Sequence, residues 1–315
     1  MENFAEIRNI FTSGKLPVAI SDSPYLLNKF TNLGFNTLSI HDVCNGLIEA
    51  PDEVILIPVA SAEHPNIKLH NALKRSSVLL IPMLAFSSSQ HSIDYLVLRL
   101  IQLNFTNACE KSRLMVEFIQ QLKTPMSVIS PECNLTIELG QNVRIFAPKL
   151  KPNISSGEWI SIIQFLEVGL IPNEEYNAFN VNGSLLCSGV SIAHHLHAHF
   201  TSGPIADEVW DYLNQLRLDK KFPLKLDVND SEVVSIKTRN GENILENIKP
   251  FTDHMLYGRL TEVGFGSLEP SDATDWSINS QLNEPSGGVH LALGAGEKAA
   301  HIDFISPYAK IANFF

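Results

Sequence analysis

The sequence predicts an α/β fold, with an N-terminal parallel-sheet α/β domain followed by a mixed α+β domain. Up to Leu122, short apolar runs alternate with amphipathic stretches, which is the pattern of strands and helices around a parallel sheet. Beyond Leu122, the sequence is typical of paired strands with tight turns. A chain of 315 residues also has the length of about two domains. The polar, Pro-containing joint Lys149–Asn153 therefore predicts domains of residues 1–148 and 149–315.

The individual elements follow from local apolar patterns. Runs rich in Leu and β-branched residues predict buried strands at Leu16–Ser21, Asn36–Ile40, Val54–Val59 and Val78–Met83. Amphipathic stretches predict helices at Pro24–Asn32, Ser92–Leu103 and Asn107–Leu122. In the second domain we expect a hairpin and a helix at Leu224–Val228, Glu232–Ile236 and Asn243–Ile248.

Composition excludes several classes of protein. Lys and Arg number 23 and Asp and Glu number 34, for a net charge of -11, which argues against nucleic-acid or anionic-membrane partners. We expect no signal peptide, because the first residues lack a basic segment followed by an apolar one, and no apolar run reaches the ~18–20 residues that span a bilayer. The four cysteines form no CxxC pair, so we expect reduced thiols in a cytoplasmic protein. Nucleotide-binding glycine motifs and a GxSxG elbow are absent from the sequence.

Possible metal ligands gather near the C-terminal end of the sequence. His301 and Asp303 stand at i and i+2, and in a strand they would point to one face and could reach one metal. His290 can approach from a neighbouring strand, and Glu262 and Glu284 precede it. Carboxylates and neutral imidazoles are the usual ligands of Zn, Co, Mn and Fe. The same residues could instead be solvated loop acids, a core histidine and a turn acceptor.

A second group of histidines lies in the segment SIAHHLHAHF, as His194, His195, His197 and His199. On a helix, His195 and His199 would share one face at i and i+4. On a strand, His195, His197 and His199 would share a face instead. The Glu of an HExxH motif is absent, so we expect a surface or subunit-facing patch, with a metal site or a substrate contact as the alternative.

The C-terminal segments resemble those of the thermophilic leucine aminopeptidase (aminopeptidase T) family of metallopeptidases. VHLALG, with His290, resembles the HIALG element of that family, and HIDFIS resembles its HxDF element. NEPSGGVH resembles the acid element before HIALG, with Glu284, and TEVGFG resembles the second acid element, with Glu262. Upstream, NISSGEW resembles the first acid element, with Glu158. The similarity is patchy and runs roughly from residue 115 to residue 305.

This resemblance implies a metallopeptidase-like second domain. It implies divalent metal ions (Zn, Co or Mn) held by the set Glu158, Glu262, His290, His301 and Asp303. Glu284 would then be a general base, a second-sphere acid or a further ligand, and Glu167 in FLEVGL is the rival of Glu158 as first ligand. A metal-activated water would cleave a peptide or small amide substrate, and the resemblance suggests a homodimer.

Two other interpretations stay open. The same fold family is similar to 2,5-dihydroxypyridine dioxygenases, and His290, His301 and Asp303 would make a 2-His-1-carboxylate site for Fe. The third is a non-catalytic, peptide-binding or scaffold protein on the same fold. The Tyr that the peptidases carry after HIALG is missing here, where Ala295, Gly296 and Glu297 stand.

Overall fold

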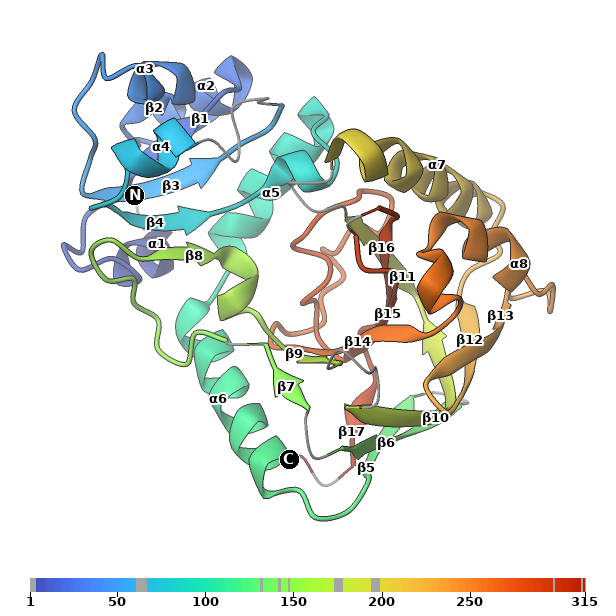
Figure 1. Cartoon of the computed structure of the whole chain (residues 1–315). Coiled ribbons are helices and arrows are strands. Elements are labelled where there is room, and N and C mark those ends of the chain that lie inside the picture. The colour runs from blue at the N-terminus through green and yellow to red at the C-terminus, as the bar shows by residue number, and fades with distance from the viewer. Residues whose placement is uncertain are drawn as a thin grey trace.

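The computed structural model describes residues 4–60, 67–130, 133–140, 143–146, 148–172, 178–193, 199–296, 298–312 and 314. These residues form one parallel sheet and two antiparallel sheets with helices packed around them (Figure 1). The predicted fold class, a parallel-sheet α/β part followed by a mixed α+β part, is confirmed. None of the helices in the described ranges is both long and apolar enough to cross a bilayer.

Sheet A is parallel and has the strand order β2-β1-β3-β4-β8. Its strands are β1 (Val18–Ser21), β2 (Thr37–Ser39), β3 (Glu53–Ile57), β4 (Ser77–Leu80) and β8 (Trp159–Ser161). Strands β3 and β4 are buried on both faces, as their continuous apolar runs predict. The helices around the sheet are α1 (Ala5–Asn9), α2 (Pro24–Asn32), α3 (Ile40–Cys44), α4 (Ile67–Ala72), α5 (Gln90–Gln102) and α6 (Phe105–Gln121). Helix α2 has the predicted bounds because Ser23 caps it and Pro24 opens it.

Sheets B and C are antiparallel and pack face to face. Sheet B has the order β13-β12-β10-β6-β5-β17 and sheet C the order β11-β16-β15-β14-β9-β7. The strands of sheet B are β5 (Met126–Ser130), β6 (Cys133–Leu139), β10 (Phe179–Cys187), β12 (Leu224–Asn229), β13 (Glu232–Lys237) and β17 (Lys310–Ile311). Those of sheet C are β7 (Arg144–Ile145), β9 (Glu167–Ile171), β11 (Gly189–Ala193), β14 (Leu260–Gly266), β15 (Val289–Leu293) and β16 (His301–Ser306). Helices α7 (His199–Leu218) and α8 (Leu245–Ile248) complete this half of the molecule.

The two faces of sheet C differ in chemistry. Val263, Leu291 and Phe304 belong to one buried apolar core shared with sheet B. Because side chains alternate along a strand, the residues next to them, among them His290 and Asp303, point to the other face. The apolar face is therefore fixed by core packing, and a one-residue slip in register would move the polar side chains into that core.

The sheets do not follow the expected division at residue 148. Strands β5, β6 and β7 precede that position and pair within sheets B and C, whereas β8 follows it and pairs with β4 in sheet A. The chain thus crosses between the sheets on both sides of the division. The two domains, residues 1–148 and 149–315, stay a prediction.

A long loop, residues 267–288, connects β14 to β15 and is tied to helix α5. The Tyr95 hydroxyl donates to Asn283 Oδ1 over 2.5 Å and accepts from the Asp275 N–H over 3.1 Å. The Arg99 guanidinium is buried, 4% exposed, and donates to oxygens of Tyr95, Thr274, Leu282 and Ser286. Buried polar groups are costly unless they are paired. These bonds therefore fix the loop against a helix that packs on sheet A.

The same loop is also tied to the edge of sheet C. The Asn279 side chain accepts from the Ile192 N–H over 2.9 Å and donates to the Ile192 carbonyl over 2.7 Å. An asparagine amide thus bonds to the edge strand β11 in the way that a neighbouring strand would. Because it is bonded both to α5 and to β11, the loop can hold a side chain at a defined position.

We predict that Tyr95→Phe destabilises the protein by about 1–3 kcal/mol, because it removes the partner of the buried Asn283 Oδ1 and of the half-buried Asp275 N–H. Tyr25→Phe is the matched control, since the Tyr25 hydroxyl bonds to Asp94 at the surface, and it should change stability by no more than about 0.5 kcal/mol. Urea unfolding of both variants measures the difference. Equal effects would show that the buried network contributes nothing.

Candidate metal centre

Six acidic and imidazole side chains converge on one face of sheet C, and we call them the acid–histidine cluster. Its members are Glu167 on β9, Glu262 on β14, His290 on β15, His301 and Asp303 on β16, and Glu284 on the loop 267–288. Strands β9, β14, β15 and β16 are consecutive neighbours in the sheet. The pairing of those strands brings together residues that lie far apart in the sequence.

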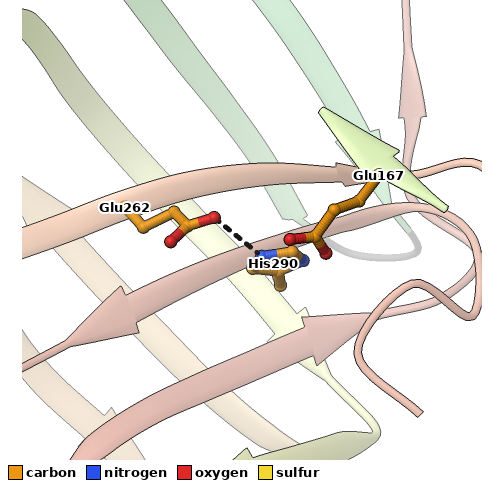
Figure 2. A group of neighbouring side chains, drawn as sticks. All are labelled: Glu167, Glu262 and His290. Carbon is orange, nitrogen blue, oxygen red and sulfur yellow. Dashed lines mark ion pairs between the residues drawn. The ribbon is translucent and has the colours of Figure 1, made fainter. Parts of the chain in front are cut away.

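The separations within the cluster suit a shared cation. His301 Nε2 lies 3.2 Å from Asp303 Oδ1 and 3.8 Å from Glu262 Oε2. His290 Nε2 lies 3.6 Å from Glu262 Oε1 and 4.0 Å from Asp303 Oδ1. Figure 2 shows the Glu262 and Glu167 carboxylates approaching the His290 ring from different strands. Ligand atoms of Glu167, Glu262 and His290 all lie within 4.8 Å of one another, as do those of Glu284, His290 and Asp303.

Several atoms of the cluster are buried without a hydrogen-bond partner in the described ranges. Both ring nitrogens of His290, both carboxylate oxygens of Asp303 and one oxygen of Glu167 are in this condition. His290 and Asp303 are 0% exposed, so water does not solvate these atoms from outside. Buried polar atoms are nearly always paired. Orphaned nitrogen and carboxylate atoms that face one another therefore fit a divalent cation, for which they are the ordinary ligands.

Two glycines make room for the cluster. A Cβ added to Gly264, which lies opposite His290 on the neighbouring strand, would overlap the His290 imidazole. A Cβ added to Gly169 would lie 2.6 Å from Glu262 Oε1. Neither position needs an unusual backbone angle, so glycine is required here only for the close approach of a side chain. Gly264 in TEVGFG and Gly169 in FLEVGL are thus part of the site.

The orientation of His301 is set by the backbone. Its Nδ1 donates to the Gly294 carbonyl over 2.8 Å, which leaves Nε2 toward Asp303 and Glu262. This arrangement is typical of metal-binding histidines, whose second ring nitrogen is held by a backbone or carboxylate oxygen. His301 and Glu262 are also part-exposed, with 20% and 16% of their side chains accessible. The cluster therefore reaches solvent on the side of these two residues.

Burial and mutual repulsion shift the pKa values of the cluster. Burial, followed by the Asp303 charge, raises the pKa of Glu284 to about 8. Burial and the neighbouring Glu284 raise the pKa of Glu167 well above its usual range. Burial alone would lower the pKa of His301, but Asp303 and the other carboxylates overcome it and raise that pKa to about 10. Without cations, the cluster holds protons in their place.

The structure does not bring Glu158 to the cluster. Its carboxylate lies 2.7 Å from Lys149 Nζ and accepts from the Ser155 N–H over 2.8 Å. The physical reason is its position just before β8, which pairs in sheet A. Glu167, its rival in the sequence, begins β9 of sheet C and is the acid found in the cluster. Of the other predicted residues, Glu262, Glu284, His290, His301 and Asp303 all lie together.

Most of the second histidine group lies outside the described residues. His194, His195 and His197 lie outside the described residues. His199 begins helix α7, and its side chain is also outside the description. The expectation of a surface patch therefore stays a prediction.

Fold and site together define an α/β protein with a buried acid–histidine cluster suited to divalent cations. The chain belongs to the family described as crocagin biosynthetic protein CgnE/B, whose model matches residues 14–314. No curated protein matches the chain.

Two solved structures resemble the fold. The 2,5-dihydroxypyridine dioxygenase from Pseudomonas putida KT2440 is 12% identical with a TM-score of 0.49, over 99% of this chain and 91% of the other. The wild-type AmpT from Thermus thermophilus is 12% identical with a TM-score of 0.48, over 98% of this chain and 94% of the other. Both likenesses concern the fold and do not identify a reaction for this chain.

We predict that Gly264→Ala removes most of the metal bound by the purified protein, because the added methyl group displaces the His290 ring. Gly183→Ala is the control, since its methyl group would overlap the Asn134 carbonyl in sheet B and no member of the cluster. Elemental analysis of both variants against wild type gives the result. Full metal content in Gly264→Ala would contradict the role assigned to His290.

We also predict that the chelator-treated protein loses stability as pH rises from about 4.5 to about 8. Over this window folded Glu284, whose pKa is about 8, keeps a proton that the unfolded chain releases near 4.5. The raised pKa of His301 adds a loss in the same direction between 6.5 and about 10. Denaturant unfolding at several pH values measures the slope, which Glu284→Gln should make shallower between pH 4.5 and 8. A stability that increases over this window would refute the assignment.

Proposed function

We propose that the protein is a divalent-metal-dependent hydrolase that cleaves a peptide or amide bond with a metal-activated water. The observation that carries this proposal is the convergence of four carboxylates and two imidazoles, several with orphaned buried atoms, on one face of sheet C. If the acids of the cluster served only to form structural ion pairs, we would expect lysine or arginine side chains beside them. Here the main partners of the acids are one another and the two histidines.

The charge of the cluster suits two cations. Glu167, Glu262, Glu284 and Asp303 carry a formal charge of about −4 when ionised, which two divalent ions would balance. The group of Glu167, Glu262 and His290, and the group that Asp303 makes with His290 and His301, support two neighbouring positions that do not need Glu284 as a ligand. Zn, Co or Mn suits such mixed carboxylate and imidazole ligands.

Bound divalent ions would supply a water of lowered pKa and a polarised carbonyl. Glu167, Glu262, His290, His301 and Asp303 would hold them, since all five stand on strands that core packing fixes. Glu284 differs because it lies on the loop 267–288 and not on a strand. Its pKa is raised to about 8 without cations, and bound divalent cations would lower that pKa so that the carboxylate could accept a proton. We assign Glu284 as the general base that takes the proton of the attacking water and returns it to the leaving amine.

The open side of the cluster bears on which substrate it accepts. The partly exposed Glu262 and His301 support entry of the substrate at that end of the cluster. A carboxylate-rich entrance suits a substrate with a positive charge, such as a free amino group. The family is described as crocagin biosynthetic, so we propose that the bond cleaved belongs to a biosynthetic intermediate, in the cytoplasm, with the protein acting as a homodimer.

A second candidate function is an iron-dependent dioxygenase. Asp303 Oδ1 lies 4.0 Å from His290 Nε2 and 3.2 Å from His301 Nε2. Two histidines with one carboxylate are the ligands of non-haem iron oxygenases. This candidate leaves Glu167, Glu262 and Glu284 without a function, whereas the hydrolase uses all of them. We therefore prefer the hydrolase.

We predict about two equivalents of Zn, Co or Mn per chain when the protein is purified without a chelator. Exchanging both His301 and Asp303 for Ala should abolish metal uptake, because both ligands of β16 are lost. Glu284→Gln should keep the metal and lower kcat on aminoacyl fluorogenic substrates by roughly 10²–10⁴-fold, as expected for loss of a general base.

The metal content of the purified protein distinguishes the hydrolase from the dioxygenase and from a binding protein. One equivalent of iron would favour the dioxygenase, and no metal, even after addition, would favour a binding protein without catalysis. Elemental analysis decides between these, and folded state is checked by circular dichroism for each variant. Normal metal content after loss of both β16 ligands would remove the proposed site.

A further inference from the structure

Ser191 on β11 stands directly opposite Asp303 on β16. Residues opposite each other on antiparallel strands point to the same face, so Ser191 lies on the face that carries the acid–histidine cluster. Its side chain is 0% exposed, and its hydroxyl has no hydrogen-bond partner among the residues described. A buried hydroxyl therefore stands beside a buried carboxylate, and neither makes a hydrogen bond among the residues described.

The same protein contains a second pair of this kind, in which the bond is made. In sheet B, Ser235 on β13 stands directly opposite Asp227 on β12. There the Ser235 hydroxyl donates to Asp227 Oδ2 over 2.6 Å. A serine in this register can therefore reach the carboxylate across from it. In sheet C the Ser191 hydroxyl makes no such bond among the residues described. There Asp303 Oδ1 lies 3.2 Å from His301 Nε2 instead.

We propose that Ser191 is a positioning residue of the metal centre, whose hydroxyl donates a hydrogen bond to the Asp303 carboxylate when Asp303 holds a divalent cation. This inference rests on the proposed metal site. A carboxylate that gives one oxygen to a metal keeps the other for a hydrogen bond, and such bonds hold the ligand in its orientation. Ser191 is the hydroxyl that the strand register supplies for this bond.

Two serine variants should differ in opposite ways in Zn²⁺ affinity and in stability. Ser191→Ala should weaken Zn²⁺ binding about 10–100-fold, the usual effect of removing a group that orients a ligand. It should not lower the stability of the chelator-treated protein, because its hydroxyl has no described partner there. Ser235→Ala should do the reverse, with lower stability and unchanged Zn²⁺ affinity, since it loses an existing bond outside the cluster.

Zn²⁺ affinity is measured by competition with a chromophoric chelator, and stability by denaturant unfolding in excess chelator. Unchanged Zn²⁺ affinity in Ser191→Ala, with normal binding by wild type, would overturn the role of Ser191 alone. A stability loss in Ser191→Ala without a change in affinity would mean an ordinary structural bond and would overturn it as well. Wild-type protein that takes up no Zn²⁺ would overturn both this inference and the proposed function.

Discussion

Repulsion among buried carboxylates is the constraint on which the site depends. Glu167, Glu284 and Asp303 are all buried, and each disfavours the ionisation of its neighbours at close range. The fold tolerates this because protons or cations can compensate the charge. Burial, followed by the charges of the neighbouring carboxylates, raises the pKa of Glu167 and of Glu284. A cluster arranged in this way lowers the stability of the protein unless it is neutralised, which is characteristic of functional sites rather than structural ones.

Sheet C can carry this repulsion because its other face is anchored. The apolar side chains of that face share one core with sheet B and with helix α7. The strands therefore cannot move apart to relieve the charge without opening the core. Glycine at positions 169 and 264 lets the acid and imidazole groups lie close against the sheet. The single member that is not on a strand, Glu284, is held by a loop whose hydrogen bonds lead to helix α5.

Much of this arrangement could be predicted from residue patterns, and the failures have physical reasons. Helix α2 carries its own start signals in Ser23 and Pro24, and the i, i+2 spacing of His301 and Asp303 already implies a shared face. The choice between Glu158 and Glu167 depended on which sheet each segment joins, and local sequence does not encode that. Ser191 carried no signal, because its importance comes from its register opposite Asp303.

The bonds between Asn279 and Ile192 have a consequence for assembly. Strand β11 is at one edge of sheet C, where an exposed row of peptide groups invites pairing with another molecule. The Asn279 side chain bonds to the outward N–H and carbonyl of Ile192. A strand from another molecule therefore cannot pair with β11 at this residue. If two copies of the chain associate, a sheet that continues from one copy to the other across Ile192 is therefore excluded, and the contact must lie elsewhere.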